Sequence, residues 1–72
     1  MSSAIEQIVD AYVMLGSREK LEDLRLHRQR LIVDLQGRAV AGYDISRPLE
    51  QLEEDLAAVE AGLAKLNSAD GW

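Results

Sequence analysis

The stretch ISRPLEQLEEDLAAVEAGLAKL, from Ile45 to Leu66, decides how the rest of the chain folds. Its large apolar residues recur at alternating steps of four and three positions, as Ile45, Leu49, Leu52, Leu56, Val59, Leu63 and Leu66. This seven-residue repeat places apolar side chains along one side of an α-helix and is typical of helices that pack knobs into holes. Such a helix is stable in water only when its apolar side packs against a partner.

The preceding segment supplies a partner helix. The residues at the same alternating spacing are Leu21, Leu24, Arg28, Leu31, Leu35 and Arg38. We predict one helix from Arg18 to Ala41 and another from about Ser46 to Asn67, separated by Gly42-Tyr43-Asp44. Ser46 is the predicted cap of the later helix, and Pro48 fits its first turn because N–H groups there have no intrahelical acceptor.

One antiparallel alignment brings these two apolar seams together, layer by layer. It pairs Leu35 with Leu52, Leu31 with Leu56, Arg28 with Val59, Leu24 with Leu63, and Leu21 with Leu66. Agreement across independent layers is expected of a sequence that specifies one fold. We therefore predict an all-α protein, an antiparallel helical hairpin with coiled-coil-like packing. Residues 1–67 form its single domain, and residues 68–72 form a polar C-terminal tail.

A shorter helix is predicted before the hairpin, from Ala4 to Leu15. Ser3 and Glu6 have the spacing of a capping box, and apolar residues follow at helical spacing: Ile5, Ile8, Val9, Tyr12 and Leu15. Gly16 suits the left-handed position after a helix, and Ser17 suits the next cap. A continuous helix through Gly16 is the alternative, because one helical glycine costs only about 1 kcal/mol.

This first helix is too short to cover the whole hairpin. It spans roughly 18 Å, against roughly 30 Å or more for each long helix. If it folds back from Gly16, the loop end of the hairpin stays open on that side, and the apolar residues left there are Ile32, Leu35, Ala39, Leu49 and Leu52.

Length and composition indicate that the fold of one chain is only marginally stable and is stabilised by association with other chains. A chain of 72 residues buries only roughly 60% of its unfolded surface. Cysteine is absent, which excludes disulfides and thiolate metal sites, and the 4% aromatic content without Phe implies an aliphatic core. We therefore expect protein partners, as a homo-oligomer or an obligate complex.

Charge and hydropathy limit the expected cellular location of the protein and its expected binding to nucleic acid or membranes. The net charge of −5 argues against general affinity for nucleic acid or anionic membrane. No apolar run approaches the roughly 20 residues of a membrane span, and the first residues lack the order of a secretory signal. We expect a cytoplasmic protein, or a virion component if a phage encodes it.

Nothing in the sequence indicates an active site. The chain contains no phosphate-binding glycine loop, no HExxH, no G-x-S-x-G and no cysteine nucleophile. The carboxylates Glu50, Glu53, Glu54, Asp55 and Glu60 face several directions of one helix, as on a solvated surface. His27 is the only imidazole and has no second histidine with which to bind a metal. We expect no enzyme, cofactor or metal.

The most basic run, Arg25 to Arg30, raises RNA binding as an alternative function. At 100° per residue, the basic residues of this helix point in several directions. Arg18 and Arg25 share one face, Lys20, His27 and Arg38 share another, and Arg30 lies on a third. A site that follows phosphates requires one stripe. Pairing with the acidic third helix is the simpler use of these charges.

Arg28 occupies a position in the apolar seam and has two interpretations. A polar residue there lowers stability but can select the register or the number of partners. Alternatively, its stem packs in the seam while its guanidinium stays in water.

A second apolar row points to a partner surface. Leu26, Val33 and Val40 are spaced seven and seven, on the side of their helix away from the seam. Together with Ile32 and Ala39 they form the predicted partner interface. The alternative explanation for this row is scattered surface hydrophobes, which are common. Ala57, Ala61 and Ala64 make a strip of small residues on the third helix, for which plain helix propensity is the alternative explanation.

Several phrases of the sequence resemble small proteins encoded in phage and prophage structural gene clusters. They are Ile8-Val9-Asp10-Ala11-Tyr12-Val13, Leu21-Glu22-Asp23-Leu24, His27-Arg28 and Glu60-Ala61-Gly62-Leu63. The resemblance implies a virion assembly role, such as a head-tail connector or portal accessory, and carries no functional residues. In general shape the predicted hairpin is also similar to the Rop type of RNA-binding dimer. We therefore expect a non-enzymatic assembly or adaptor protein, with a dimeric RNA-binding regulator as the alternative.

Overall fold

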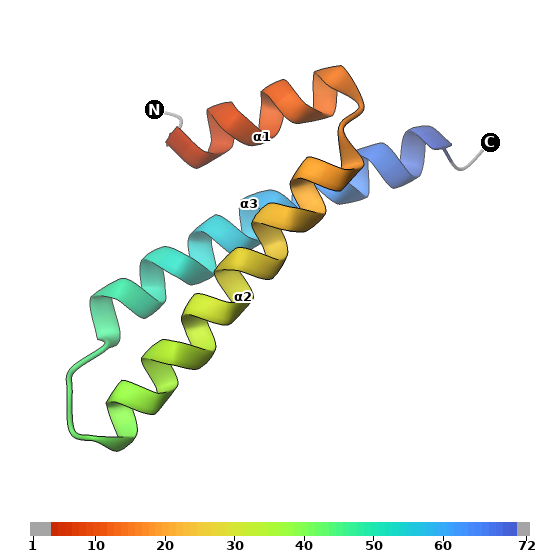
Figure 1. The fold of residues 1–72 in the computed structure, drawn as a ribbon. Coiled ribbons are helices and arrows are strands. Elements are labelled where there is room, and N and C mark those ends of the chain that lie inside the picture. Colours follow the sequence, from red (N-terminus) through yellow and green to blue (C-terminus); the bar gives the residue numbers. More distant parts are fainter. Residues whose placement is uncertain (1–3, 71–72) are drawn as a thin grey trace.

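The computed structural model describes residues 4–70, and the side chains of residues 4–68. These residues form three helices and no strand: α1 (Ala4–Leu15), α2 (Arg18–Val40) and α3 (Ser46–Asp70) (Figure 1). The predicted all-α class and the three predicted helices are confirmed. Helix α3 continues three residues beyond the predicted end at Asn67, so the predicted polar tail begins too early. Ser3 of the predicted capping box and Trp72 lie outside the described residues.

Two glycines end α1 and α2 in the same way. Gly16 has a φ of 67° and Gly42 a φ of 97°, the left-handed region that glycine adopts without strain. After α1, the Ser17 N–H donates to the Tyr12 carbonyl at 2.9 Å, and the Gly16 N–H donates to Val13 at 3.1 Å. This pair of bonds is a Schellman motif, which satisfies carbonyls at a helix end. The alternative of one continuous helix through Gly16 is therefore wrong.

The same pair of bonds closes α2. The Tyr43 N–H donates to the Arg38 carbonyl at 3.1 Å, and the Gly42 N–H donates to Ala39 at 3.0 Å. The chain then turns back through residues 41–45, and α3 lies beside α2 (Figure 1).

Asp44, not Ser46, caps the start of α3. One oxygen of Asp44, Oδ1, accepts both the Ser46 hydroxyl at 2.6 Å and the Ser46 backbone N–H at 3.0 Å. Ser46 is already the first helical residue, and the Ile45 carbonyl accepts the first helical bond, from Leu49. The prediction of Ser46 as the cap is thus wrong, because an aspartate two residues before an N–H can close a turn onto it.

These two bonds make the turn sensitive to pH. The Ser46 hydroxyl, and after it the Ser46 N–H, lower the pKa of Asp44 below its ordinary value of 3.8. A carboxyl whose pKa is lower in the folded chain contributes stability above the unfolded pKa and loses it as pH falls through the folded pKa. We expect the Ser46 amide resonance to titrate below pH 3.8, and Asp44→Asn to remove this titration. A midpoint at or above 3.8 would contradict the cap.

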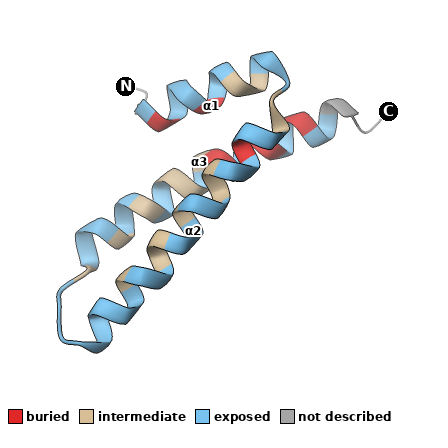
Figure 2. Cartoon of the chain, viewed as in Figure 1, coloured by how far each residue is buried: buried red, intermediate tan, exposed pale blue. Residues whose placement is uncertain are grey.

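The buried core lies where all three helices meet. It consists of Ile5 and Val9 from α1, Leu21 from α2, and Val59, Leu63 and Leu66 from α3 (Figure 2). Leu21 and Val59 have no exposed surface. Helix α1 packs mainly on α3, where Gly62 allows its close approach. The core is aliphatic, as the composition predicts.

The loop end of α2 and α3 has no such cover. Toward the loop, Leu31, Leu35, Leu49 and Leu52 are only half-buried, and no fully buried residue lies there (Figure 2). Because α2 and α3 extend beyond the part that α1 covers, the molecule is elongated, with extents of 48 × 25 × 15 Å. The expectation that a short first helix leaves this end open is confirmed.

Candidate functional site

The outer side of α2 carries the predicted apolar row. We call Leu26, Val33 and Val40 the outer row; their side chains are 46%, 65% and 91% exposed. They lie on the side of α2 away from the core residue Leu21, as the seven-residue spacing requires. Among the described residues, Leu26 is partly covered, and Val33 and Val40 are largely exposed.

The other two residues of the predicted interface lie elsewhere. Ile32 and Ala39 each precede a member of the outer row by one residue, and so lie about 100° around the helix from it. Ile32 is half-buried and Ala39 is exposed. The five predicted interface residues therefore do not share one surface.

A groove marks the uncovered loop end. It has a volume of about 340 Å³ and is lined by four apolar and three polar residues of the two long helices: Leu31, Asp34, Leu35, Arg38, Pro48, Gln51 and Leu52. A second groove, beside Ile5 and Glu6 at the start of α1, also includes Gln51. The loop-end groove therefore continues the line along which α1 packs on α3.

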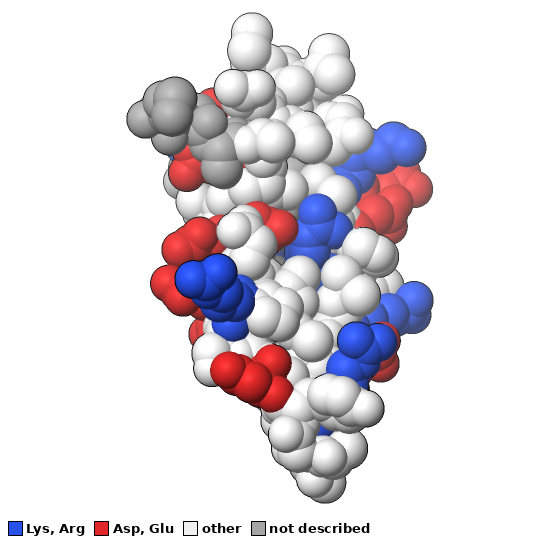
Figure 3. Space-filling model, turned by 90° about the vertical axis from the view of Figure 1, so that its left-hand side faces the viewer, with Lys and Arg blue, Asp and Glu red and all other residues white. Residues whose placement is uncertain are grey.

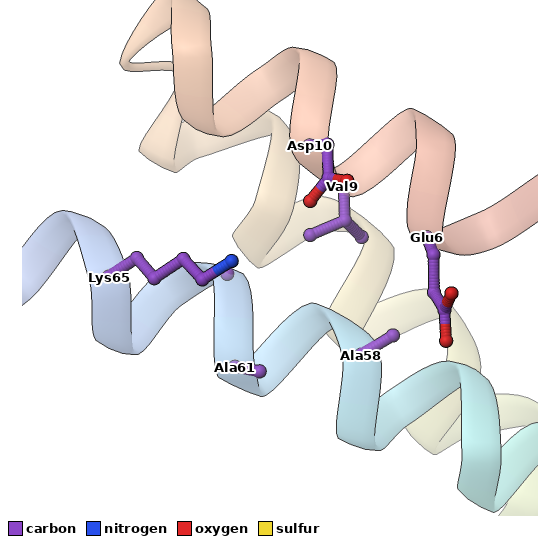
Figure 4. A pocket seen from close by; sticks show the side chains of 7 residues that line it. Glu6, Val9, Asp10, Ala58, Ala61 and Lys65 are labelled. Atoms are coloured by element: carbon purple, nitrogen blue, oxygen red, sulfur yellow. The ribbon is translucent and has the colours of Figure 1, made fainter. Parts of the chain in front are cut away.

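A third hollow lies between α1 and α3 (Figure 4). Its volume is about 270 Å³, with Val9, Ala58 and Ala61 among its walls. Glu6 and Lys65 lie toward its opposite ends. No group of three or more acidic, histidine or cysteine side chains in residues 4–68 is placed to hold a metal ion. The hollow lies at the junction of α1 and α3.

Arg28 is anchored in the middle of the molecule. Its Nε donates to Asp55 Oδ2 at 3.3 Å, and its Nη1 donates to His27 Nδ1 at 2.6 Å. Gln51 donates to the other Asp55 oxygen at 2.9 Å. The side chains of Arg28 and Asp55 are 21% and 13% exposed, so the guanidinium does not simply extend into water. This ion pair joins α2 to α3.

Replacing Arg28 alone is expected to destabilise the protein. Arg28→Leu fills the seam but leaves the largely covered Asp55 carboxylate with only Gln51, at a cost of about 1–3 kcal/mol. Replacing both partners, as Arg28→Leu with Asp55→Leu, should recover that stability, because well-packed apolar pairs match or exceed buried ion pairs. If Arg28 selects the register, the double variant should form mixed oligomers. Equal thermal unfolding of the single variant and the native chain would contradict this role of the pair.

On the face that Figure 3 shows, the charged side chains of the described residues form no single basic stripe. In the view of Figure 3, Lys and Arg side chains are interspersed with Asp and Glu. Within the basic run, Arg28 is already paired with Asp55. This arrangement does not favour the RNA-binding alternative. Over the described part of the chain, no helix combines the length and the hydropathy that crossing a membrane requires.

Sequence reasoning missed a second exposed apolar side, on α1. Ile8 and Leu15 were expected in the same pattern as Ile5 and Val9, yet they are 45% and 75% exposed. The helix buries only its Ile5–Val9 side, because it meets one neighbour closely. The signal was present in the spacing of Ala4, Ile8, Ala11 and Leu15, which again alternates four and three.

Comparison with known proteins adds no relative: no protein-family model matches the chain, and neither a curated protein nor a solved structure is significantly similar to it.

Proposed function

We propose that this chain is a non-enzymatic structural or adaptor protein that acts through helix–helix packing in an oligomer. In this proposal α2 and α3 form an antiparallel hairpin with coiled-coil-like packing, and a further helix covers the outer row. The observation that carries it is the exposure of Val33 and Val40 in a row with helical periodicity. Apolar side chains in such a row gain free energy when another helix removes them from water.

The shape of the molecule supports association. Its radius of gyration is 13.9 Å, whereas a compact domain of 72 residues has about 11 Å. A body elongated in this way encloses fewer side chains than a compact one of the same length. A neighbouring chain adds the layer that the outer row and the loop-end groove lack.

The resemblance to proteins of phage structural gene clusters supports a biological setting. We propose the assembly of a phage particle, in which a small helical protein serves as a head-tail connector or portal accessory. The phrases Ile8–Val13 and Glu60–Leu63 carry this resemblance. Structural or packaging genes beside the coding sequence would support this setting, and neighbours unrelated to phage would count against it.

The test of the oligomer is the dependence of unfolding on concentration. When association stabilises the folded state, the melting temperature rises with protein concentration. We expect the midpoint of the helical circular-dichroism signal at 222 nm to rise by several degrees over about a hundredfold in concentration. A midpoint that does not move over that range would contradict the proposal.

A further inference from the structure

The outer row belongs to a longer seam with two non-apolar members. On α2 the positions 26, 30, 33, 37 and 40 alternate by four and three, and all five residues are exposed: Leu26, Arg30, Val33, Gly37 and Val40. At 100° per residue they lie within about a quarter of the helix circumference. We call these five residues the outer seam. It has the same periodicity as the seam by which α2 meets α3, but faces the opposite way.

No contact among the described residues explains the glycine at position 37. A methyl group added there would meet nothing within 4 Å, whereas one at Gly62 would overlap Val9. A glycine inside a helix costs roughly 0.5–1 kcal/mol relative to alanine. Gly62 offsets that cost by letting α1 approach, and Gly37 faces open space. If a neighbouring helix packs on the outer seam, Gly37 has the same role as Gly62, because it leaves space for a bulky side chain of that neighbour.

The outer seam is nearly symmetric about Val33. Leu26 and Val40 lie seven residues to either side, and Arg30 and Gly37 lie three and four residues away. We propose that the outer seam binds the same seam of a second copy, antiparallel, with the two-fold axis at Val33. Val33 then meets its own copy, Leu26 meets Val40, and the long Arg30 side chain lies beside Gly37. The proposal rests on the proposed oligomer and specifies its contact.

Charge complementarity favours this partner. Arg30 and Asp34, with Gln29 and Val33, line a shallow hollow of about 360 Å³ on α2. In an antiparallel pair centred on Val33, Arg30 of one copy and Asp34 of the other differ by only about 3 Å along the helix axis. They also lie on the same flank of the contact, because a two-fold axis perpendicular to both helices keeps each flank opposite itself. Two reciprocal ion pairs therefore flank the axis.

The parallel arrangement lacks this complementarity. It places Arg30 in one layer with Arg30 of the second copy, which brings like charges together at the centre of the contact. It also places Gly37 against Gly37, which leaves the seam underfilled. The alternation of charge and size along the outer seam thus selects the antiparallel pair.

Charge reversal tests the register. Arg30→Asp and Asp34→Arg should each raise the dissociation constant by about tenfold or more, because each puts like charges across the contact. An equimolar mixture of the two variants should associate within about threefold of the native chain, since both ion pairs re-form. Circular dichroism checks that each variant remains helical, and sedimentation velocity measures association.

Cysteine substitution tests orientation independently, because the chain has no cysteine. Val33→Cys alone should oxidise to a linked dimer, as should a mixture of Leu26→Cys with Val40→Cys, whereas Leu26→Cys alone should not.

The outcomes separate the contact from the oligomer. A native chain that associates but is indifferent to charge reversal, or that links through Leu26→Cys alone, would overturn the antiparallel contact and leave the proposed function standing. A native chain that does not associate would overturn both.

Discussion

Val33→Glu is expected to convert the associated protein into monomers. Val33 is 65% exposed in the single chain and lies at the centre of the outer seam. In the antiparallel contact the substitution puts two carboxylates face to face at the two-fold axis. Like charges across an interface cost several kcal/mol, so the dissociation constant should rise by about 100-fold or more. Sedimentation velocity at fixed concentration measures the change, and circular dichroism shows whether the released chain unfolds on dilution.

Met14→Glu is the matched control for this substitution. Met14 is 88% exposed on α1, so the chemical change, apolar to acidic at an exposed helical site, is the same. It lies outside the outer seam, and its association should equal that of the native chain. Association that survives Val33→Glu unchanged would show that the outer seam is not the contact. Loss of association in Met14→Glu alone would move the contact to α1.

Gly62→Val is expected to separate α1 from α3. An added Cβ at Gly62 overlaps Val9 Cγ1 and lies 3.3 Å from Val13 Cγ2 and 3.6 Å from Leu21 Cδ1, and valine adds two further methyl groups. Overpacking of this kind costs about 1–3 kcal/mol, which lowers the melting temperature of a domain of this size by roughly 4–24 °C. Hydrogen exchange should show the loss of protection concentrated in α1, with its core residues Ile5 and Val9.

Gly37→Val is the counterpart on the other side of the molecule. Apart from the neighbouring backbone of α2 itself, no atom of the described residues lies within 4 Å of its added Cβ, and valine is a better helix former than glycine. The single chain should therefore fold normally, while its association weakens because the space for Arg30 is filled. Equal loss of folding in the Gly62 and Gly37 variants would contradict the distinction between them.

The sequence was sufficient to predict the helices, because their ends have local causes. Gly16 and Gly42 end helices by a backbone conformation that few other residues adopt, and both predicted breaks are present. The apolar repeat of α3 extends from Ile45 to Leu66, and the buried residues Val59, Leu63 and Leu66 are members of it. Local conformation and periodicity can be read along one chain.

Contacts that depend on side-chain geometry between segments were predicted less well. Asp44 and Ser46 are both good capping residues, and only the turn geometry shows that Asp44 accepts the bonds. Ile8 and Leu15 satisfy the helical pattern as well as Ile5 and Val9 do, but their exposure depends on the side from which α3 approaches. The side of α1 on which α3 packs cannot be predicted from the sequence alone.

The candidate surface was predicted in part for the same reason. Periodicity identified Leu26, Val33 and Val40, which are exposed on one side of α2. It grouped them with Ile32, which the fold half-buries. It passed over Arg30 and Gly37, because neither is apolar, although both have the spacing of the outer seam. Arg30 and Gly37 were assigned to the outer seam from the open space around Gly37 and from the position of Arg30 beside Asp34.

Sedimentation equilibrium of the native chain tests the central claim, that this protein acts as an assembly of packed helices, most directly. Over about 1–100 µM the account predicts a concentration-dependent mass that approaches twice the 8.0 kDa of one chain, or a higher multiple. A single species of 8.0 kDa across that range, helical and cooperatively folded, would contradict it.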